Sequence, residues 1–393
     1  MAATADAPVF FLAHAGAELY GADRVFLESA RALVAAGSQV SVALPCGGPL
    51  VKLLADAGAR VFICPSPVLR KSMLNPLGLL RLAGAAVAGS VRGVRLLRGI
   101  QPDAVYVNTV TIPLWPVLGK LLRIPVLVHV HEAERTAAKP VRTALAFPLL
   151  CAARIVCNSR YSALALAEAL PRLAGRAVVV DNAVPGPPAP AAPRTTPGPP
   201  LRVLYLGRLS ARKGVHTAIA AVVQARAGGL DAELDIVGAV FEGNEAYLDS
   251  LHRQVADSGA GAAVQFHGFD ADVWKWFAAC DVAVVPSAGD EPFGDTAVEA
   301  VLARRPVIAS RTPGLAEAAG GYACVQLVEA GDPAAMAAAL QTLTAQWPVF
   351  SGAAVNDSAA AAARHSPARY GARIRAELME LLPGAAAVRR PVP

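Results

Sequence analysis

Two acidic residues, Glu291 and Glu299, have the spacing that most clearly suggests chemistry in this chain. Residues 281–286 predict a buried strand that runs into a loop, and the residues after Phe293 predict a helix. Glu291 would therefore lie at the carboxyl end of a strand, where open α/β sheets bind ligands, with Glu299 on the following helix. Ionised carboxylates accept strong hydrogen bonds from sugar and ribose hydroxyls. The pair predicts a site for a hydroxyl-rich ligand, whereas Glu299 by itself also fits a solvated helix surface.

A cationic loop upstream suggests an anion site. Residues 201–206 form an apolar run typical of a strand covered on both faces, and the loop from Gly207 to Gly214 separates it from a helix that begins near residue 215. Arg208 and Lys213 would lie beside the free N–H groups of that helix, which favour an anion. The planar Arg fork and the mobile Lys charge both suit phosphate. Arg212 is either a third cation of this loop or solvated, and we expect it to be solvated. The alternative is a basic loop that pairs with surface acids.

The first half contains weaker candidates. Gly21 lies where a helix is expected to begin and would let backbone N–H groups approach a phosphate. His129 and His131 share one face of the strand segment 126–132, and His131, nearer the strand end, is the candidate to contact a sugar or acceptor. A structural histidine inside the sheet is the alternative. Glu132 and Glu134 either bind acceptor hydroxyls or lie on a loop surface.

Metal, disulfide and hydrolase chemistry are not indicated. Asp270 and Asp272 match an Asp-x-Asp pattern, but they precede an apolar helix and are expected to cap it, so no metal is predicted. The 6 cysteines lie singly in apolar runs, which argues against a disulfide framework or zinc site and favours a reducing cytosol. No Gly-x-Ser-x-Gly motif or legible catalytic triad is present.

Length and periodicity predict two domains. A chain of 393 residues exceeds one compact core, and 54% hydrophobic with only 6% aromatic residues suits packed α/β layers. Residues 9–12 predict a first strand rather than a signal peptide, and no apolar stretch is long enough to span a membrane. We therefore expect two doubly wound parallel-sheet (Rossmann-like) domains that face a cleft. The predicted divisions are an N-terminal domain 1–183, a proline-rich linker 184–200, a C-terminal domain 201–365, and a crossover helix and tail 366–393 that packs on the N-terminal domain.

The alternation of strands and helices supports these divisions. Strands are predicted in the first half at 9–13, 39–44, 60–64, 104–108, 125–130, 154–157 and 177–181. In the second half they are predicted at 203–206, 233–237, 264–267, 282–286, 306–309 and 322–326. The clearest helices are 21–36, 114–122 and 143–153, with 367–382 as the crossover helix.

Charge is unevenly distributed along the chain. Residues 1–183 carry 19 Lys and Arg against 10 Asp and Glu, and no acid occurs between Asp56 and Asp103. Cations alternate with leucine and valine in this interval, which includes Arg60, Arg70, Lys71, Arg81, Arg92, Arg95 and Arg98. Such a stretch suits an anionic membrane surface, and the alternative is an ordinary core-facing helix with a basic solvent side. Nucleic acid is a poor candidate because no aromatic stacking set accompanies the charge.

Taken together, these motifs resemble the family 4 retaining glycosyltransferases, also called glycosyl transferases group 1, which have the GT-B fold. The loop from Gly207 to Gly214 is similar to that family's donor-diphosphate loop, and Glu291 with Glu299 is similar to its glutamate pair. The segment 14–24 resembles its glycine-rich first loop, and 157–159 and 180–183 resemble its Asn-Ser turn and its Asn-Gly hinge. Ala183 replaces the usual hinge glycine. The resemblance extends from about residue 8 to residue 382.

The resemblance implies transfer of a sugar from a nucleotide-diphosphate donor to a hydroxyl acceptor with retention, without metal or cofactor. Arg208 and Lys213 would stabilise the departing diphosphate, Glu291 would hold the donor sugar, Glu299 would bind ribose, and a histidine, His131 or His129, would place the acceptor. The donor contacts are expected at Gly21, Gly207, Gly268, Phe269, Phe293, Gly294, Asp295, Thr296 and Glu299.

Partners and alternatives follow from the same resemblance. The acceptor would be a glycan, a lipid-linked molecule or a small molecule, with polysaccharide or glycolipid assembly as a setting, in the cytoplasm or at the inner face of the membrane. A sugar-nucleotide 2-epimerase and a noncatalytic partner subunit of another transferase are the rival functions. The donor nucleotide, sugar and linkage are not legible in the sequence.

Overall fold

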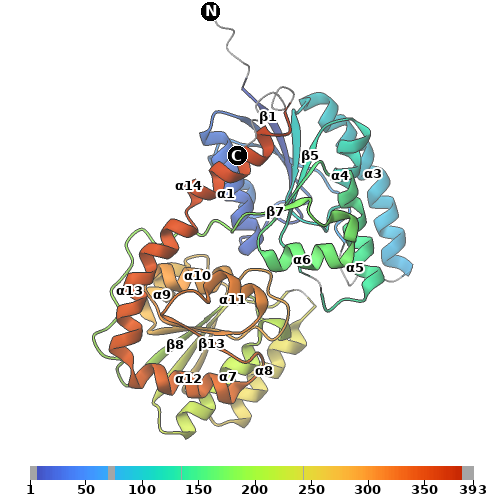
Figure 1. Cartoon of the computed structure of the whole chain (residues 1–393). Helices are drawn as coiled ribbons and strands as arrows, with labels where there is room; N and C mark the ends of the chain where they lie inside the picture. The colour runs from blue at the N-terminus through green and yellow to red at the C-terminus, as the bar shows by residue number, and fades with distance from the viewer. Residues whose placement is uncertain (1–6, 70–75, 134, 242, 383–393) are drawn as a thin grey trace, which may run out of the picture. The chain divides into compact units, whose positions relative to one another are not determined.

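The computed structural model describes residues 7–69, 76–133, 135–241 and 243–382. Arg70, Lys71 and Glu134 lie outside the described residues. The chain divides into two compact units, one formed by residues 1–183 with 367–393 and the other by residues 184–366 (Figure 1). We call them the N-terminal unit and the C-terminal unit. Both have a parallel sheet with helices on its two faces, as the alternating pattern predicts.

The sheet of the N-terminal unit contains seven parallel strands in the order β3-β2-β1-β4-β5-β6-β7. The strands are β1 (Val9–Ala13), β2 (Gln39–Leu44), β3 (Arg60–Ile63), β4 (Ala104–Val107), β5 (Val126–Val130), β6 (Arg154–Cys157) and β7 (Ala177–Val179). The order reverses direction between β1 and β4. Ligands of open parallel sheets bind outside the carboxyl ends of the strands at such a switch point.

Helices cover both faces of this sheet. They are α1 (Gly21–Ala35), α2 (Pro49–Asp56), α3 (Pro76–Ile100), α4 (Leu114–Leu121), α5 (Lys139–Ala146), η2 (Phe147–Cys151), α6 (Arg160–Ala169), η3 (Pro171–Leu173) and α14 (Pro367–Met379). The core on one face is shared by α1, α2 and α14, and the core on the other by α3, α4, η2 and α6. The C-terminal helix α14 returns to this unit and packs against α1 (Figure 1), where a Cβ on Gly371 would meet the Cβ of Ala32 at 2.4 Å.

The sheet of the C-terminal unit has six parallel strands in the order β10-β9-β8-β11-β12-β13 and reverses between β8 and β11. Its strands are β8 (Leu201–Leu206), β9 (Ala232–Val237), β10 (Val264–Gly268), β11 (Val282–Val285), β12 (Val307–Ser310) and β13 (Val325–Val328). Its helices are η4 (Ala211–Lys213), α7 (Val215–Ala227), α8 (Glu245–Asp257), α9 (Val273–Ala279), α10 (Asp295–Leu302), α11 (Pro313–Ala319), α12 (Pro333–Ala345) and α13 (Trp347–Arg364).

The proline-rich segment 184–200 lies within the C-terminal unit rather than apart from it as a linker. Arg194 forms a bidentate ion pair with Asp281, which precedes β11 and is 2% exposed. The indole N–H of Trp347 donates to the carbonyl of Arg194 at 2.9 Å. These contacts hold an extended segment that has few backbone hydrogen bonds of its own.

Two predicted elements are wrong in detail. The helix expected at 143–153 is instead α5 followed by the 3-10 helix η2, because Pro148 has no N–H to continue an α-helix. The strand expected at 322–326 begins only at Val325, since the amide of Tyr322 closes a turn onto Ala319 after α11. The other strand and helix bounds differ from the predictions by at most three residues.

Candidate functional site

The loops that follow β8 and β11 bring the predicted cations and carboxylate of the C-terminal unit together. Lys213, at the end of η4, places its Nζ 2.5 Å from Oε2 of Glu291. The Ser287 hydroxyl donates to the same carboxylate oxygen at 3.1 Å. Because β8 and β11 are neighbours at the switch point, Lys213 and Glu291 meet although 78 residues separate them in sequence.

Glu291 remains ionised although it is 6% exposed. Burial by itself raises its pKa, but attraction to Lys213 and Arg212, with hydrogen bonds from Lys213 and Ser287, outweighs burial and lowers it. A carboxylate kept charged in a buried position retains lone pairs for hydroxyl donors. The local charges therefore suit Glu291 to a polyhydroxylated ligand.

Arg212 is not simply solvated, as the sequence suggested. Its NH1 group donates to the carbonyl of Asp290 at 2.5 Å and lies 3.7 Å from Oε2 of Glu291. The backbone amide of Ala288 also donates to the carbonyl of Arg212 at 2.8 Å, which joins the two loops. The Arg212 side chain is 46% exposed, as expected, but spacing along one loop does not show that Glu291 lies opposite it. Arg212 is thus a third cation of this cluster.

Arg208 occupies a different part of the same loop. Its guanidinium lies over the ring of Phe241, 3.4 Å from the ring centroid, in a cation–π contact. Phe241 follows β9 and keeps 45% of its surface exposed. Phe241 was not predicted as a site residue, since a lone aromatic residue after a strand has no recognisable pattern. Its contact fixes the direction of the guanidinium.

Glycines let these loops approach one another closely. A Cβ on Gly214, which has φ +72°, would lie 1.8 Å from the carbonyl of Pro286 at the end of β11. A Cβ on Gly238 would lie 1.8 Å from the carbonyl of Gly207, and the Gly238 amide donates to Gly268 at 2.7 Å. Gly207, Gly238 and Gly268 therefore line the carboxyl ends of β8, β9 and β10 without side chains. Gly238, which the sequence analysis missed, repeats the pattern of an apolar strand that ends in glycine.

The start of α10 contains the other predicted donor contacts of this unit. Gly294 has φ +108° at the N-cap, where a Cβ would lie 2.4 Å from Leu315. Phe293 and Glu299 are buried, whereas Asp295 and Thr296 are partly exposed beside the first turn. Phe269, after β10, is exposed. The backbone N–H groups at the start of α10 lie directly after the loop of Glu291.

The N-terminal unit has a buried polar network at its own switch point. Asp23 Oδ1 lies 2.7 Å from Nε2 of His14, and the Asn108 amide nitrogen lies 3.1 Å from Nδ1 of the same histidine. His131 Nε2 lies 2.9 Å from Oδ1 of Asn108. Burial, then repulsion from His129 and His14, holds the pKa of His131 well below its usual value. His131, 9% exposed after β5, is consequently neutral at pH 7.

His129 lies deeper in the same network. Its Nδ1 contacts the Tyr106 hydroxyl at 2.8 Å, and burial lowers its pKa to about 3. Ser29 links Tyr106 at 3.1 Å to Tyr370 of α14 at 2.6 Å. Of the two histidines, His129 is fully buried and connects the sheet to α14, whereas His131 lies at the strand end. His14, Asp23 and Asn108 were not assigned roles from the sequence, because Asn108 follows β4 whereas His14 and Asp23 follow β1.

The acidic candidate Glu132 has structural contacts. Glu132 accepts hydrogen bonds from the Thr109 hydroxyl and from the backbone amides of His131 at 3.0 Å and Val110 at 3.4 Å, which ties the loops after β4 and β5 together. Burial raises its pKa although these bonds oppose the shift. Gly21, by contrast, is exposed at the first residue of α1.

The Asp-x-Asp segment organises the start of α9. Hydrogen bonds to Asp270 from Lys275, Trp276 and the Asp272 amide lower the pKa of its carboxyl to about 2. Asp272 is the N-cap residue but makes no capping bond with its side chain, so only part of the expected cap is present. Within the part of the chain that the structure describes, no three His, Cys, Asp or Glu side chains are grouped to hold a metal ion.

The fold and site define an α/β protein whose C-terminal sheet has cations and an ionised carboxylate in contact at its switch point. Comparison with known families assigns it further. The model "Glycosyl transferases group 1" matches residues 192–352, and "Glycosyltransferase Family 4" matches residues 20–186. The chain belongs to the family 4 glycosyltransferases, which confirms the resemblance seen in its sequence.

Curated relatives match parts of the chain. A lipopolysaccharide core biosynthesis glycosyltransferase, LpsE of Rhizobium meliloti (strain 1021), is 33% identical over 44% of this chain and 45% of its own length. A glycogen synthase of Mycobacterium tuberculosis (strain ATCC 25618 / H37Rv) is 36% identical over 38% of this chain and 35% of its own. The matches thus span less than half the length of these relatives. A 2-deoxystreptamine glucosyltransferase of Streptomyces kanamyceticus is 28% identical over 71% of this chain and 77% of its own length.

Solved structures confirm the predicted GT-B fold. Anabaena Alr3699/HepE, crystallised in complex with UDP and glucose, has a TM-score of 0.80 at 23% identity, covering 95% of this chain and 99% of that one. A sucrose-phosphate synthase from Thermosynechococcus elongatus has a TM-score of 0.74 at 20% identity, covering 97% and 100%. At these identities the likeness concerns the fold alone.

Proposed function

We propose that this protein transfers a sugar from a nucleotide-diphosphate donor to a hydroxyl acceptor with retention of anomeric configuration. The observation that carries the proposal is the meeting of Lys213 and Arg212 with the ionised Glu291 at the switch point of the C-terminal sheet. Cations and a carboxylate in contact match a ligand whose phosphate end is anionic and whose sugar end offers hydroxyl donors.

The cations would stabilise the leaving diphosphate. Negative charge grows on the diphosphate as the glycosidic bond breaks, so groups that bind it more strongly in the transition state accelerate the reaction. Lys213 and Arg208 would do this, with Arg212 beside them and the N–H groups at the start of α7. The Lys213 ammonium now pairs with Glu291 and would be shared between carboxylate and phosphate when donor binds.

The rest of the donor would lie along the strand ends. Glu291, with backbone around Phe293, Gly294, Asp295 and Thr296, would hold the sugar hydroxyls. Glu299 would bind ribose. The nucleotide base would lie beside Gly268 and Phe269, and the phosphates beside Gly207. The two glycines lack Cβ atoms, so a ligand can approach their backbone closely.

The N-terminal unit would supply the acceptor side. A neutral His131 whose Nε2–H donates to Asn108 retains a lone pair on Nδ1 for a hydroxyl. The side chains described suggest no separate general base, and the departing phosphate would take the acceptor proton. Gly21 at the start of α1 would approach the donor phosphate. The mechanism would need neither metal nor cofactor.

The comparisons guide the choice of substrates. UDP and UDP-glucose are bound by Alr3699/HepE, so these are the first donors to test. The names of the curated relatives include lipopolysaccharide core biosynthesis, glycogen synthesis and an aminocyclitol acceptor. The acceptor classes to compare are therefore a lipid-linked saccharide, a glucan and a small polyhydroxylated molecule.

A donor screen tests the proposal directly. Purified protein would be incubated with UDP- and GDP-sugars and each acceptor class, and mass spectrometry would measure nucleoside diphosphate release and product mass. NMR of the product would give the anomeric configuration. Release that depends on acceptor and retains configuration supports the proposal, and an inverted product would overturn the retaining mechanism.

The same screen separates the rival functions. A sugar-nucleotide 2-epimerase would change the donor sugar without any acceptor. A noncatalytic partner subunit would release no nucleoside diphosphate with any donor. The charged cluster around Glu291 favours the transferase, because a scaffold has no need of an ionised buried carboxylate. For location, we propose the cytoplasm, with peripheral association at the inner face of the membrane through the N-terminal unit.

A further inference from the structure

Four helices that lie together on one face of the N-terminal unit contain no acidic residue. Along α3, α4, α5 and η2, the sequence contains no Asp or Glu. These helices pack in succession over one face of the sheet, α3 against α4, α4 against η2, and η2 against α5 (Figure 1). We call this surface the acid-free face. The opposite face is different, since Glu28 pairs with Arg31 on α1 and Asp56 with Lys52 on α2.

Most cations on the acid-free face lack acidic partners, although Arg142 of α5 lies 3.8 Å from Glu168 of the neighbouring α6. Among the residues that the structure describes, six basic side chains on or directly after these helices are exposed and form no ion pair: Arg92, Arg95, Arg98, Lys120, Arg123 and Lys139. On α1 and α2 the cations are paired with acids, so the unpaired cations are a property of the acid-free face and not of the whole unit. An uncompensated positive surface attracts a polyanionic partner and loses that attraction as salt screens it.

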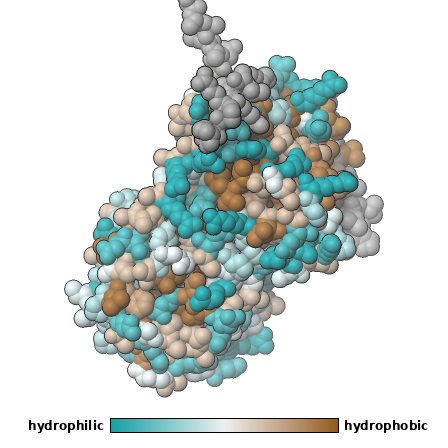
Figure 2. All heavy atoms as spheres, in the orientation of Figure 1, coloured by the Kyte–Doolittle hydropathy of each residue, from teal (hydrophilic) through white to brown (hydrophobic). Residues whose placement is uncertain are grey.

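Large apolar side chains accompany these cations. The ones that extend from the layer toward solvent are Val87 and Val91 on α3, Val117 and Leu121 on α4, and Phe147 on η2. Leu121 is 72% exposed and Phe147 63%, both higher than any large apolar residue of the C-terminal unit except Val349. Figure 2 shows hydrophobic residues at the surface beside hydrophilic ones on the side where Figure 1 places α3 and α5.

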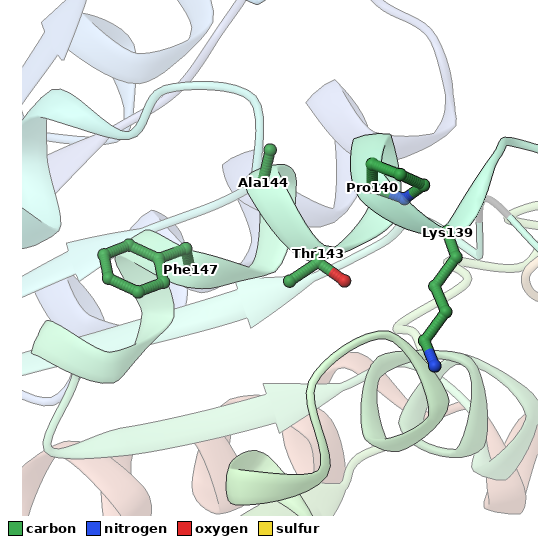
Figure 3. A pocket seen from close by; sticks show the side chains of 5 residues that line it. All are labelled: Lys139, Pro140, Thr143, Ala144 and Phe147. Carbon is green, nitrogen blue, oxygen red and sulfur yellow. The ribbon is translucent and has the colours of Figure 1, made fainter.

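Phe147 borders a hollow in this surface. Phe147 lies at one end of an open hollow along α5 and Lys139 at the other, with Pro140, Thr143 and Ala144 between them (Figure 3). An apolar ring next to a cation suits the boundary between lipid headgroups and acyl chains, where the ring inserts and the ammonium remains with phosphate. A folded acidic protein would complement the positive charge, but binding it would not require several separate exposed apolar side chains.

We propose that the acid-free face docks on an anionic lipid bilayer, with Leu121 and Phe147 entering the headgroup region and the unpaired cations contacting lipid phosphates. The inference goes beyond glycosyl transfer and needs neither donor nor acceptor. Interfacial binding requires no transmembrane segment, and within the described residues no helix is long and apolar enough to cross a bilayer.

Vesicle sedimentation tests the proposal without any sugar donor, so its failure is distinct from failure of the transferase activity. The probes are vesicles of phosphatidylcholine alone and with about one third phosphatidylglycerol. Wild-type protein should bind the anionic vesicles, bind the neutral ones far less, and lose binding as salt is raised. Arg95→Gln with Lys120→Gln should weaken anionic-vesicle binding by about 25-fold, roughly fivefold for each cation near the surface.

The apolar contribution is tested by Leu121→Gln with Phe147→Gln, which should weaken binding by about tenfold or more. Arg95, Lys120, Leu121 and Phe147 are all exposed, and circular dichroism would verify that the variants fold. Matched controls are Arg31→Gln with Lys52→Gln on the opposite face and Val349→Gln in the C-terminal unit, which should bind as wild type does. Absence of binding to anionic vesicles, or equal losses in the controls, overturns the proposal. So does light scattering that shows a dimer lost in the Phe147→Gln variant, because the face would then join two copies.

Discussion

The two units place electrostatically different side chains at equivalent places in their sheets. Each sheet reverses between two central strands, β1 and β4 in one and β8 and β11 in the other. In the C-terminal unit the loops at that edge contain an ionised carboxylate and cations in contact. In the N-terminal unit two neutral histidines, His129 and His131, contact Tyr106 and Asn108, and one carboxylate, Asp23, contacts His14. Fixed charges can stabilise the charge that grows on a leaving diphosphate. Neutral donors and acceptors can orient a hydroxyl.

The difference between the two sites explains why one was easier to predict from the sequence than the other. Charged residues of the C-terminal unit stand in two continuous motifs, 207–214 and 290–299, so each loop could be recognised alone. The N-terminal network is assembled from residues after three strands, and only its histidines stand out. Contacts between loops, such as that of Arg212 with Glu291, depend on strand order, which periodicity does not specify. Parallel strands themselves were predictable, because strands buried on both faces are nearly continuous apolar runs.

The largest expected effect is the loss of a cation from the C-terminal unit. Lys213→Ala and Arg208→Ala should each lower kcat/KM by about 30- to 1000-fold, or roughly 2–4 kcal/mol, because a donor to the developing negative charge is removed. Steady-state kinetics with the donor found in the screen would measure this. Arg226→Ala, which breaks the exposed pair with Asp231 and a hydrogen bond to the carbonyl of Ala232, is the control and should retain activity. Turnover like wild type in both site variants would show that the charged cluster serves another purpose.

A second substitution distinguishes charge from shape at the same site. Glu291→Gln keeps the side-chain shape but removes the ionised acceptor, and should lower kcat/KM by about 10- to 100-fold, since hydrogen bonds to charged groups contribute roughly 1.5–3 kcal/mol. Affinity for free nucleoside diphosphate, measured by calorimetry, should change far less. Glu245→Gln, on the exposed start of α8, is the matched control. Equal losses in transfer and nucleotide affinity would mean that Glu291 does not hold the sugar.

The neutral network should be visible in the pH dependence of stability. His129 has a folded-state pKa of about 3 against roughly 6.5 when unfolded, so below pH 6.5 the unfolded chain binds a proton that the folded chain excludes. Stability is therefore lost as pH falls. His129→Gln should reduce the slope of unfolding free energy against pH by about 1.4 kcal/mol per pH unit between pH 6 and 4. This holds whatever the substitution does to the free energy of unfolding at pH 7.

Urea unfolding at each pH, followed in the N-terminal unit by hydrogen exchange, would measure the slope for His129→Gln. The control is His252→Gln on the exposed side of α8, which should leave the slope as in wild type. An unchanged slope in the His129 variant would mean that the network holds a charged histidine. The comparison between a charged and a neutral unit would then fail.

The smallest effect is expected where the network reaches α14. Tyr370→Phe removes the hydroxyl that contacts Ser29 at 2.6 Å and His129 at 3.5 Å and keeps the ring in the core. The loss should be about 1 kcal/mol of unfolding free energy, the usual net value of one buried hydrogen bond. Tyr247→Phe, which removes a partly buried bond to His216 in the C-terminal unit, is the control for loss of a hydroxyl. Hydrogen exchange in α1 and β4 should rise in the Tyr370 variant alone, because Ser29 and Tyr106 lose a shared partner. If exchange there stayed as slow as in wild type, α14 would be held to the sheet by apolar packing and not by the polar network.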